Sequence, residues 1–168
     1  MGKIGGFKEY SRTDESNVVV QERVSNYNEF TIPLPKDKMK EQGSRCMDCG
    51  IPFCHSACPL GNLIPDFNDM VHHGKWQNAL EILQSTNNFP EFTGRLCPAP
   101  CEKSCVLGII NEPVAIENIE KNIVERGFAE GWIILRLRWF PLRTARCSSP
   151  PIRTRPVCAC TRKSAPTR

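Results

Sequence analysis

The chain has 168 residues, enough for one domain or one small domain with appendages, and its 40% hydrophobic content allows a modest core. Its net charge of +4 averages two unlike parts: residues 133–168 carry nine Lys or Arg and no Asp or Glu, which leaves −5 on residues 1–132. The average is therefore no sign of a nucleic-acid-binding protein, and no stretch approaches the roughly 20 apolar residues of a membrane span.

Cysteine is the unusual component, with ten in the chain. No apolar export segment follows the charged start MGKIGGFKEYSRTDES. We therefore expect a cytoplasmic protein, and in that reducing compartment clustered cysteines bind metal more often than they form disulfides.

Residues 1–44 are predicted to be an irregular N-terminal segment. Prolines and lysines are mixed in FTIPLPKDKMKEQGSR, as in an extended lead-in. The stretch SNVVVQERV fits either a short strand or a short helix, and the pattern does not decide between them.

Three helices are predicted in the following domain, residues 45–132. The first covers 64–74, with Pro65 near its start, where the missing N–H costs nothing. The second, in KWQNALEILQS, repeats apolar residues at i, i+3, i+4 and i+7 and forms a helical hairpin with the first. A loop, TNNFPEFTGRLCPAPCEKSC, leads to a third helix from Pro113 to about Phe128. The expected fold is a mainly α, small helical domain.

The character of the chain changes abruptly at Ile133. Residues 133–168 have no acidic residue, no periodic apolar face and many Arg and Pro, so we expect a disordered tail. Out-of-frame translation or a misplaced gene end is the favoured explanation; a basic arm that binds nucleic acid or an acidic partner is the alternative. Three tail cysteines lack ligand-like spacing: Cys147, Cys158 and Cys160.

The other seven cysteines form two groups. The first group reads C-x2-C-x4-C-x3-C-P and the second reads C-P-x2-C-x3-C; their members are Cys46, Cys49, Cys54 and Cys58, then Cys97, Cys101 and Cys105. In ferredoxin-type runs three thiolates hold one cluster, and the fourth, followed by Pro, serves the other cluster of a pair. Transferred to this chain, the pattern assigns Cys46, Cys49, Cys54 and Cys105 to cluster one, and Cys58, Cys97 and Cys101 to cluster two. This wiring would hold the helical hairpin between two clusters.

Seven cysteines leave one ligand position of two four-ligand clusters open. Glu120 lies within the apolar stripe of the third helix, with Ile116 and Val124 as its i±4 neighbours, where a bare carboxylate is costly. Glu117 and Lys121 are expected to pair on the outer side. Cluster iron is one candidate partner for Glu120, which makes Glu120 the candidate eighth ligand; the alternative is a glutamate that reaches water at the edge of the stripe.

Zinc and disulfides are the competing interpretations of the cysteines. Two zinc sites would need eight ligands, which the seven cysteines and His55 supply, but zinc sites usually show C-x2-C twice and the sequence has it once. Disulfides are disfavoured by the odd number of clustered cysteines. His55 is interpreted as a turn residue or one that supports a ligand, and His72 and His73 as surface residues.

The chain also lacks the motifs of an independent enzyme. It has no G-x-G-x-x-G after a strand, no P-loop and no plausible nucleophile and base. We therefore expect it to relay electrons for a partner and not to catalyse a reaction by itself.

The region RCMDCGIPFCHSACPLGNLIPDFNDMVHHGKWQNALEILQSTNNFPEFTGRLCPAPCEKSC closely resembles the N-terminal iron–sulfur domain of the glutamate synthase small subunit. GKIGGFKEYSR and PVAIENIEKNIVERGFAEGW extend the resemblance to about residues 2–132. The same domain type occurs in dihydropyrimidine dehydrogenase and related flavoprotein reductases. The resemblance implies an α-helical domain with two [4Fe–4S] clusters, and the glutamine that is the eighth ligand in the dehydrogenase relative matches Glu120.

The resemblance also implies a role in glutamate biosynthesis. In that family NAD(P)H reduces FAD in the domains that follow, and electrons pass through the clusters to FMN in the large subunit. We expect those FAD and NAD(P)H domains to begin shortly after Trp132, and this sequence lacks them. The expected partner is the large subunit, with no nucleic acid and no membrane. A zinc-stabilised interaction module, a redox-inert adaptor and the same domain type from another flavoprotein reductase are the alternatives.

Overall fold

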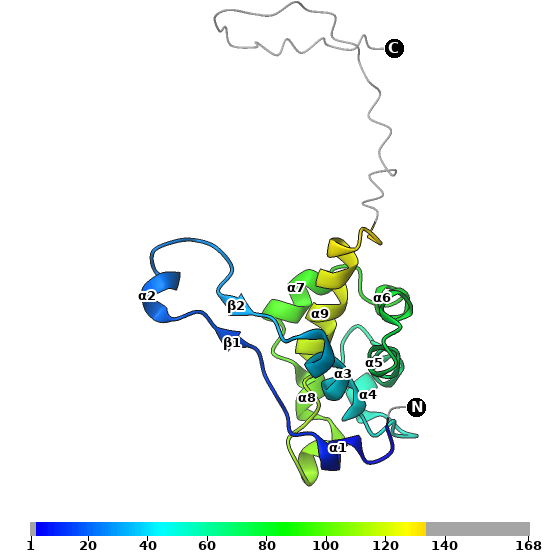
Figure 1. Ribbon diagram of the computed structural model, residues 1–168. Helices are drawn as coiled ribbons and strands as arrows, with labels where there is room; N and C mark the ends of the chain where they lie inside the picture. Colours follow the sequence, from blue (N-terminus) through cyan, green and yellow to red (C-terminus); the bar gives the residue numbers. More distant parts are fainter. Residues whose placement is uncertain (1–2, 134–168) are drawn as a thin grey trace, which may run out of the picture. The chain divides into compact units, whose positions relative to one another are not determined.

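The long helix α9 (Ile116–Ala129) organises the computed structural model, which describes residues 3–133 (Figure 1). Helices α7 (Pro90–Leu96) and α6 (Trp76–Gln84) pack against it, and their contact follows from the spacing of buried Ile116, Ile119 and Ile123 along one side of α9. The described residues lie in one compact unit, Met1–Ile134. The prediction of a mainly α fold is confirmed.

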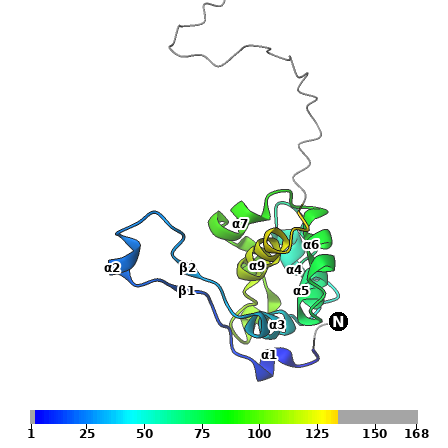
Figure 2. The ribbon, with the colours of Figure 1, turned by 45° about the horizontal axis from the view of Figure 1, so that its top comes forward.

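The predicted helical hairpin is present as α5 (Ile64–His72) and α6, which pack side by side (Figure 2). Gly74, at φ +72, makes the turn between them. A further helix, α3 (Lys36–Ser44), packs on α5. The core that these helices enclose contains Met39, Ile64, Phe67, Val71, Trp76, Ala79, Leu80, Leu83, Leu107, Val114, Ile116, Ile119 and Ile123.

Cys46 and Cys49 lie between α3 and the next helix, and the other five cysteines lie in or directly beside short helices. These helices are α4 (Phe53–Ala57), α7, α8 (Pro100–Lys103) and the 3₁₀ turn η1 (Val106–Ile109). The prediction of a loop between α6 and α9 was therefore wrong over α7 and α8, because Pro90 and Pro100 stand in the first helical turn, where proline is accommodated. The third predicted helix begins at Ile116 and not at Pro113.

The N-terminal segment is more regular than its composition indicates. The arm, residues 14–33, pairs β1 (Ser16–Asn17) with β2 (Thr31–Ile32) in antiparallel register and carries α2 (Val20–Arg23) between them. Figures 1 and 2 show this arm extending beyond the helices. SNVVVQERV thus contains both a strand and a helix.

The prediction of an extended segment over residues 1–44 was wrong at α1 (Gly6–Glu9) and at α3. Helix α3 follows directly after Pro35 and buries Met39 and Gln42, while its lysines face outward. Burial against α5, which a proline- and lysine-rich sequence does not reveal, stabilises this helix.

Among residues 3–133 no helix has the length and apolar character needed to cross a membrane. The predicted tail covers residues 133–168, of which 134–168 lie outside the described residues.

Candidate metal centre

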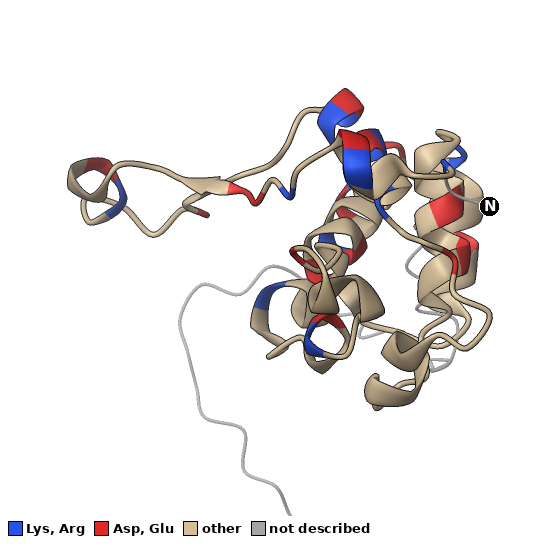
Figure 3. Ribbon diagram, turned by 90° about the horizontal axis from the view of Figure 1, so that it is seen from below, with Lys and Arg blue, Asp and Glu red and all other residues tan. Residues whose placement is uncertain are grey.

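Four thiols line one pocket between the first cysteine loop and η1. They belong to Cys46, Cys49, Cys54 and Cys105, and the other wall residues include Met47, Ile64, Leu107, Val114 and Ile116. No Lys, Arg, Asp or Glu occurs from Cys49 to Pro65, so this part of the ribbon is tan in Figure 3. The pocket therefore combines four sulfur donors with apolar walls.

Burial sets the electrostatics of this pocket. It raises the pKa of the Cys46 thiol to about 11 and that of Cys54 to about 12, and the neighbouring Cys105 adds to both shifts. Four thiolates are thus unfavourable here without compensating positive charge. Bound iron supplies such charge, because metal coordination deprotonates thiols.

Arg45 fixes the two segments that carry Cys46 and Cys105. Its fully buried guanidinium donates hydrogen bonds to the carbonyl oxygens of Glu112 (2.8 Å), Pro113 (3.1 Å) and Tyr10 (3.1 Å). It thereby ties the start of the first loop to the chain that follows the last cysteine. The sequence gives no sign of this role of Arg45 beyond its position next to Cys46.

Both cysteine loops contain a left-handed residue. Asp48 (φ 50°) and Ala99 (φ 48°) are the two non-glycine residues with positive φ between Lys3 and Ile133. This conformation costs about 1–3 kcal/mol and clusters at functional sites. In the first loop, hydrogen bonding from the Asp48 backbone opposes the raised pKa of the Cys46 thiol. Both strained residues thus lie between two cysteines of the same group.

The second set of predicted ligands comes from four helices. Cys58 ends α4, Cys101 lies in α8, Cys97 ends α7 and Glu120 is in the middle of α9. Helix α4 packs on α8, and both α7 and α8 pack on α9. The pKa of the Cys101 thiol is raised to about 12, mainly by burial and then by the nearby acidic groups, Glu102 first. Cys58, Cys101 and Glu120 thus belong to helices that pack on one another, whereas Cys54, one helical turn before Cys58, lines the first pocket.

Glu120 is 6% exposed and is held by neutral donors. Asn87 Nδ2 (2.9 Å) and the Thr93 hydroxyl donate to Oε1, and Asn62 Nδ2 (3.1 Å) donates to Oε2. Burial raises the pKa of Glu120, and these hydrogen bonds oppose the shift. A carboxylate has about four lone-pair sites, so three donors leave room for a further partner. The apolar stripe of the third helix predicted Glu120, whereas no sequence pattern predicted its three donors.

Helix α7 approaches α9 closely through Gly94. A Cβ atom added there would lie 2.8 Å from Lys121 Cβ and 2.9 Å from its Cα. The missing side chain lets α7 bring Thr93 to the side of α9 that carries Glu120.

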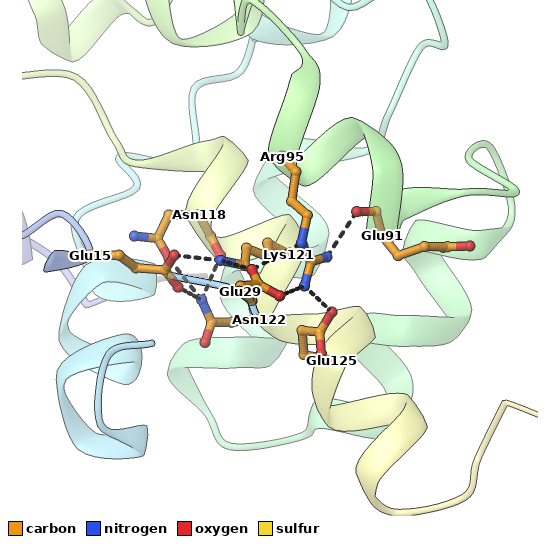
Figure 4. Close-up of polar contacts among 8 residues, drawn as sticks. All are labelled: Glu15, Glu29, Glu91, Arg95, Asn118, Lys121, Asn122 and Glu125. Atoms are coloured by element: carbon orange, nitrogen blue, oxygen red, sulfur yellow. Dashed lines mark hydrogen bonds and ion pairs between the residues drawn. The ribbon is translucent and has the colours of Figure 1, made fainter. Parts of the chain in front are cut away.

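The arm contacts these same two helices (Figure 4). Lys121 Nζ lies 2.8 Å from Glu15 Oε2 and 3.2 Å from Glu29 Oε1, and Arg95 Nη2 lies 2.8 Å from Glu29 Oε2. The predicted pairing of Lys121 with Glu117 was wrong, because Lys121 reaches the arm instead.

The histidines contribute little to either group. His55 Nε2 accepts a hydrogen bond from the Ile64 backbone N–H (3.0 Å), which joins α4 to the start of α5, in the turn role that the sequence favoured. His72 is half-buried and His73 is exposed. The seven cysteines between Lys3 and Ile133 are free thiols. In the same range, no three His, Cys, Asp or Glu side chains converge closely enough to hold a single metal ion.

Comparison with known proteins identifies the domain. The family model described as dihydropyrimidine dehydrogenase domain II, 4Fe-4S cluster, matches residues 23–132. The chain belongs to this family. The family is described by its 4Fe-4S cluster. The pocket lined by four cysteines fits such a cluster, because [4Fe–4S] clusters are held by four cysteine thiolates.

Several proteins that are similar to this chain are glutamate synthases. The chain is 51% identical over 134 residues to the glutamate synthase [NADPH] small chain of Mycobacterium tuberculosis, covering 79% of this chain and 28% of the relative. It is 48% identical over 146 residues to that of Bacillus subtilis, covering 82% and 30%. It is also 50% identical over 133 residues to glutamate synthase [NADH] of Saccharomyces cerevisiae, covering 78% and 6%. The chain thus spans less than a third of the length of these relatives.

Proposed function

We propose that this chain holds two [4Fe–4S] clusters and relays electrons between them as part of a glutamate synthase. Cluster one would be bound by Cys46, Cys49, Cys54 and Cys105. Cluster two would be bound by Cys58, Cys97, Cys101 and Glu120. When bound, such clusters supply one-electron redox chemistry, at potentials that ligands, hydrogen bonds and solvent exposure set.

The observation that carries this proposal is one pocket lined by three cysteines of the first loop and by the distant Cys105. Cys58 follows Cys54 by one helical turn, yet it does not line this pocket, and α4, which it ends, packs on α8, which contains Cys101. This division into two groups favours the crossed wiring over one four-cysteine site in the first loop. The protein's own task is to keep both sets of donors in place and to exclude water from the apolar pocket.

The residues around Glu120 have a definable role in the proposal. Asn62, Asn87 and Thr93 hold the carboxylate in one orientation, and no Lys, Arg or His of residues 3–133 forms an ion pair with it. Cluster iron would supply the missing positive charge. A carboxylate in place of a thiolate would make cluster two chemically distinct from cluster one.

The wider function follows from the relatives whose names include glutamate synthase. In the proposed pathway NAD(P)H reduces FAD in domains outside this sequence, and the clusters carry electrons to FMN in the large subunit. The chain alone would be a redox component without catalytic activity. Its partner would be the large subunit, in the cytoplasm.

Anaerobic reconstitution with iron and sulfide tests the cofactor assignment. We expect a brown protein with about eight iron and about eight sulfide per chain, because each cubane contains four of each. Zinc bound in stoichiometric amount without broad visible absorbance would contradict the proposal and favour a zinc-stabilised module.

The relay is tested separately, with the reconstituted chain and an isolated FMN-containing large subunit. Dithionite-reduced chain should reduce the FMN under anaerobic conditions, and reconstituted chain that has not been reduced serves as the control. FMN that stays oxidised would contradict the proposed partner but not the cluster assignment.

A further inference from the structure

One buried amide of α5 has no visible use in the fold. Asn68 is completely buried, on the same side of the helix as Phe67 and Val71. Neither its Nδ2 nor its Oδ1 atom has a hydrogen-bond partner of normal geometry among residues 3–133. Leaving such a group unpaired costs about 1–3 kcal/mol, so its position needs an explanation.

The other buried asparagines show how this domain normally satisfies an amide. Asn62 donates to Glu120 and accepts from the Thr86 hydroxyl (2.8 Å). Asn87 donates to Glu120 and accepts from the Phe89 backbone N–H (3.0 Å). Asn68 is the exception among these three buried asparagines, and it is the one that lies at the first pocket.

Asn68 belongs to the wall of the pocket that contains Cys46, Cys49, Cys54 and Cys105. Its side chain lines this pocket together with Cys46 and Cys54, two predicted ligands of cluster one. Gly43 fixes its depth, because a Cβ there would lie 2.9 Å from the Asn68 carbonyl oxygen and would push α5 away from α3. The unpaired donor is thus held against the sulfur donors of the pocket.

We propose that Asn68 donates an N–H···S hydrogen bond to the sulfur of cluster one and raises its reduction potential. This inference rests on the proposed function, since it requires cluster one to be present. A donor aimed at sulfur stabilises the added negative charge when the cluster takes up one electron. Asn68 is therefore a positioning and tuning residue, not a ligand.

The test is the Asn68→Leu variant, which keeps the size of the side chain but removes the donor. Removing the donor should lower the ratio of reduced to oxidised cluster one at a fixed potential about tenfold. For a one-electron couple this equals a downward shift of about 59 mV. Redox titration monitored by electron paramagnetic resonance (EPR) measures this shift in potential. The EPR signal that is lost in Cys101→Ala belongs to cluster two, which leaves the other signal for cluster one.

Asn78→Leu is the matched control, because Asn78 is an exposed asparagine on the neighbouring helix α6. It should leave both potentials unchanged. An unchanged potential of cluster one in Asn68→Leu would overturn the inference, and so would equal shifts of both clusters. If wild-type protein binds no iron, the proposed function fails; if wild type carries both clusters and only the Asn68 effect is absent, this inference alone fails.

If Asn68→Leu does not fold, Asn68→Asp is tested instead, because it keeps the shape of the side chain and replaces the donor with an acceptor. The potential of cluster one should also fall in this variant. If neither variant retains cluster one, wild-type protein labelled with ¹⁵N in asparagine side chains is used. Electron–nuclear double resonance should then detect an amide ¹⁵N coupled to the reduced cluster. Absence of that coupling overturns the proposal.

Discussion

The two groups of candidate ligands differ in almost every feature except their number of donors. The first group has four thiols in an apolar pocket beside the uncharged stretch from Cys49 to Pro65. The second combines three thiols with Glu120, whose carboxylate is held by three neutral donors. Because ligand charge, hydrogen bonds and burial set the potential of a cluster, the comparison predicts two clusters with different potentials in one small domain.

The largest effect is expected from removing single cysteines. Cys54→Ala and Cys101→Ala should each lose one cluster, lowering iron from about eight to about four per chain. The informative variant is Cys58→Ala, because Cys58 is close to Cys54 in sequence but is assigned to the other group. Its EPR spectrum should match that of Cys101→Ala. A match with Cys54→Ala would contradict the assignment of Cys58 to cluster two.

Glu120→Ala should remove cluster two and leave cluster one intact. It also leaves the three buried donors of this carboxylate without their acceptor, at a cost of about 1–3 kcal/mol for each unsatisfied group. Iron content and EPR measure the first effect and denaturant unfolding the second. Glu81→Ala, at an exposed position of α6, is the control. Full occupancy of cluster two in Glu120→Ala would show that Glu120 is structural and not a ligand.

Gly94→Ala should affect the second group without touching the first. The added methyl group meets the Lys121 backbone and pushes α7 away from α9, and such overpacking costs about 1–3 kcal/mol. We expect a lower melting temperature and reduced occupancy of cluster two. Gly50→Ala is the matched control beside Cys49, since nothing lies within 4 Å of its added Cβ. Equal losses in both variants would mean that close packing of α7 on α9 is not the cause.

The smallest effect is expected from Glu29→Gln in the arm. Hydrogen bonding from Arg95 lowers the pKa of Glu29 to about 2, so the pair is fully charged above the normal pKa of 4.5 and is lost as the pH falls toward 2. Glu29 is half exposed, and such pairs contribute less than about 1 kcal/mol. Limited proteolysis of the arm should be slightly faster at neutral pH, with both clusters retained. Loss of cluster two would show that the arm supports the second group.

Periodicity and spacing revealed some parts of this domain and not others. The α5–α6 hairpin was predictable because Trp76, Ala79, Leu80 and Leu83 recur at helical spacing over about two turns. Helices α7 and α8 were not, because seven and four residues are too short for a periodic signal and their prolines resemble those of a loop.

The same limit applies to the candidate site. Glu120 was identifiable as a charged residue within an apolar stripe. Its donors Asn62, Asn87 and Thr93 lie 58, 33 and 27 residues away in sequence, so only the folded chain brings them together. Arg45 and Asn68 are likewise single polar residues whose significance comes from burial, which no local pattern encodes.

The most direct test of the two-cluster account is the Mössbauer spectrum of wild-type protein reconstituted with ⁵⁷Fe. The account predicts two [4Fe–4S] components, with about one iron in eight distinguished by an oxygen ligand that Glu120 supplies. That distinct iron should disappear in Glu120→Ala. A spectrum of a single cluster, or of two clusters with only thiolate-ligated iron, would contradict it.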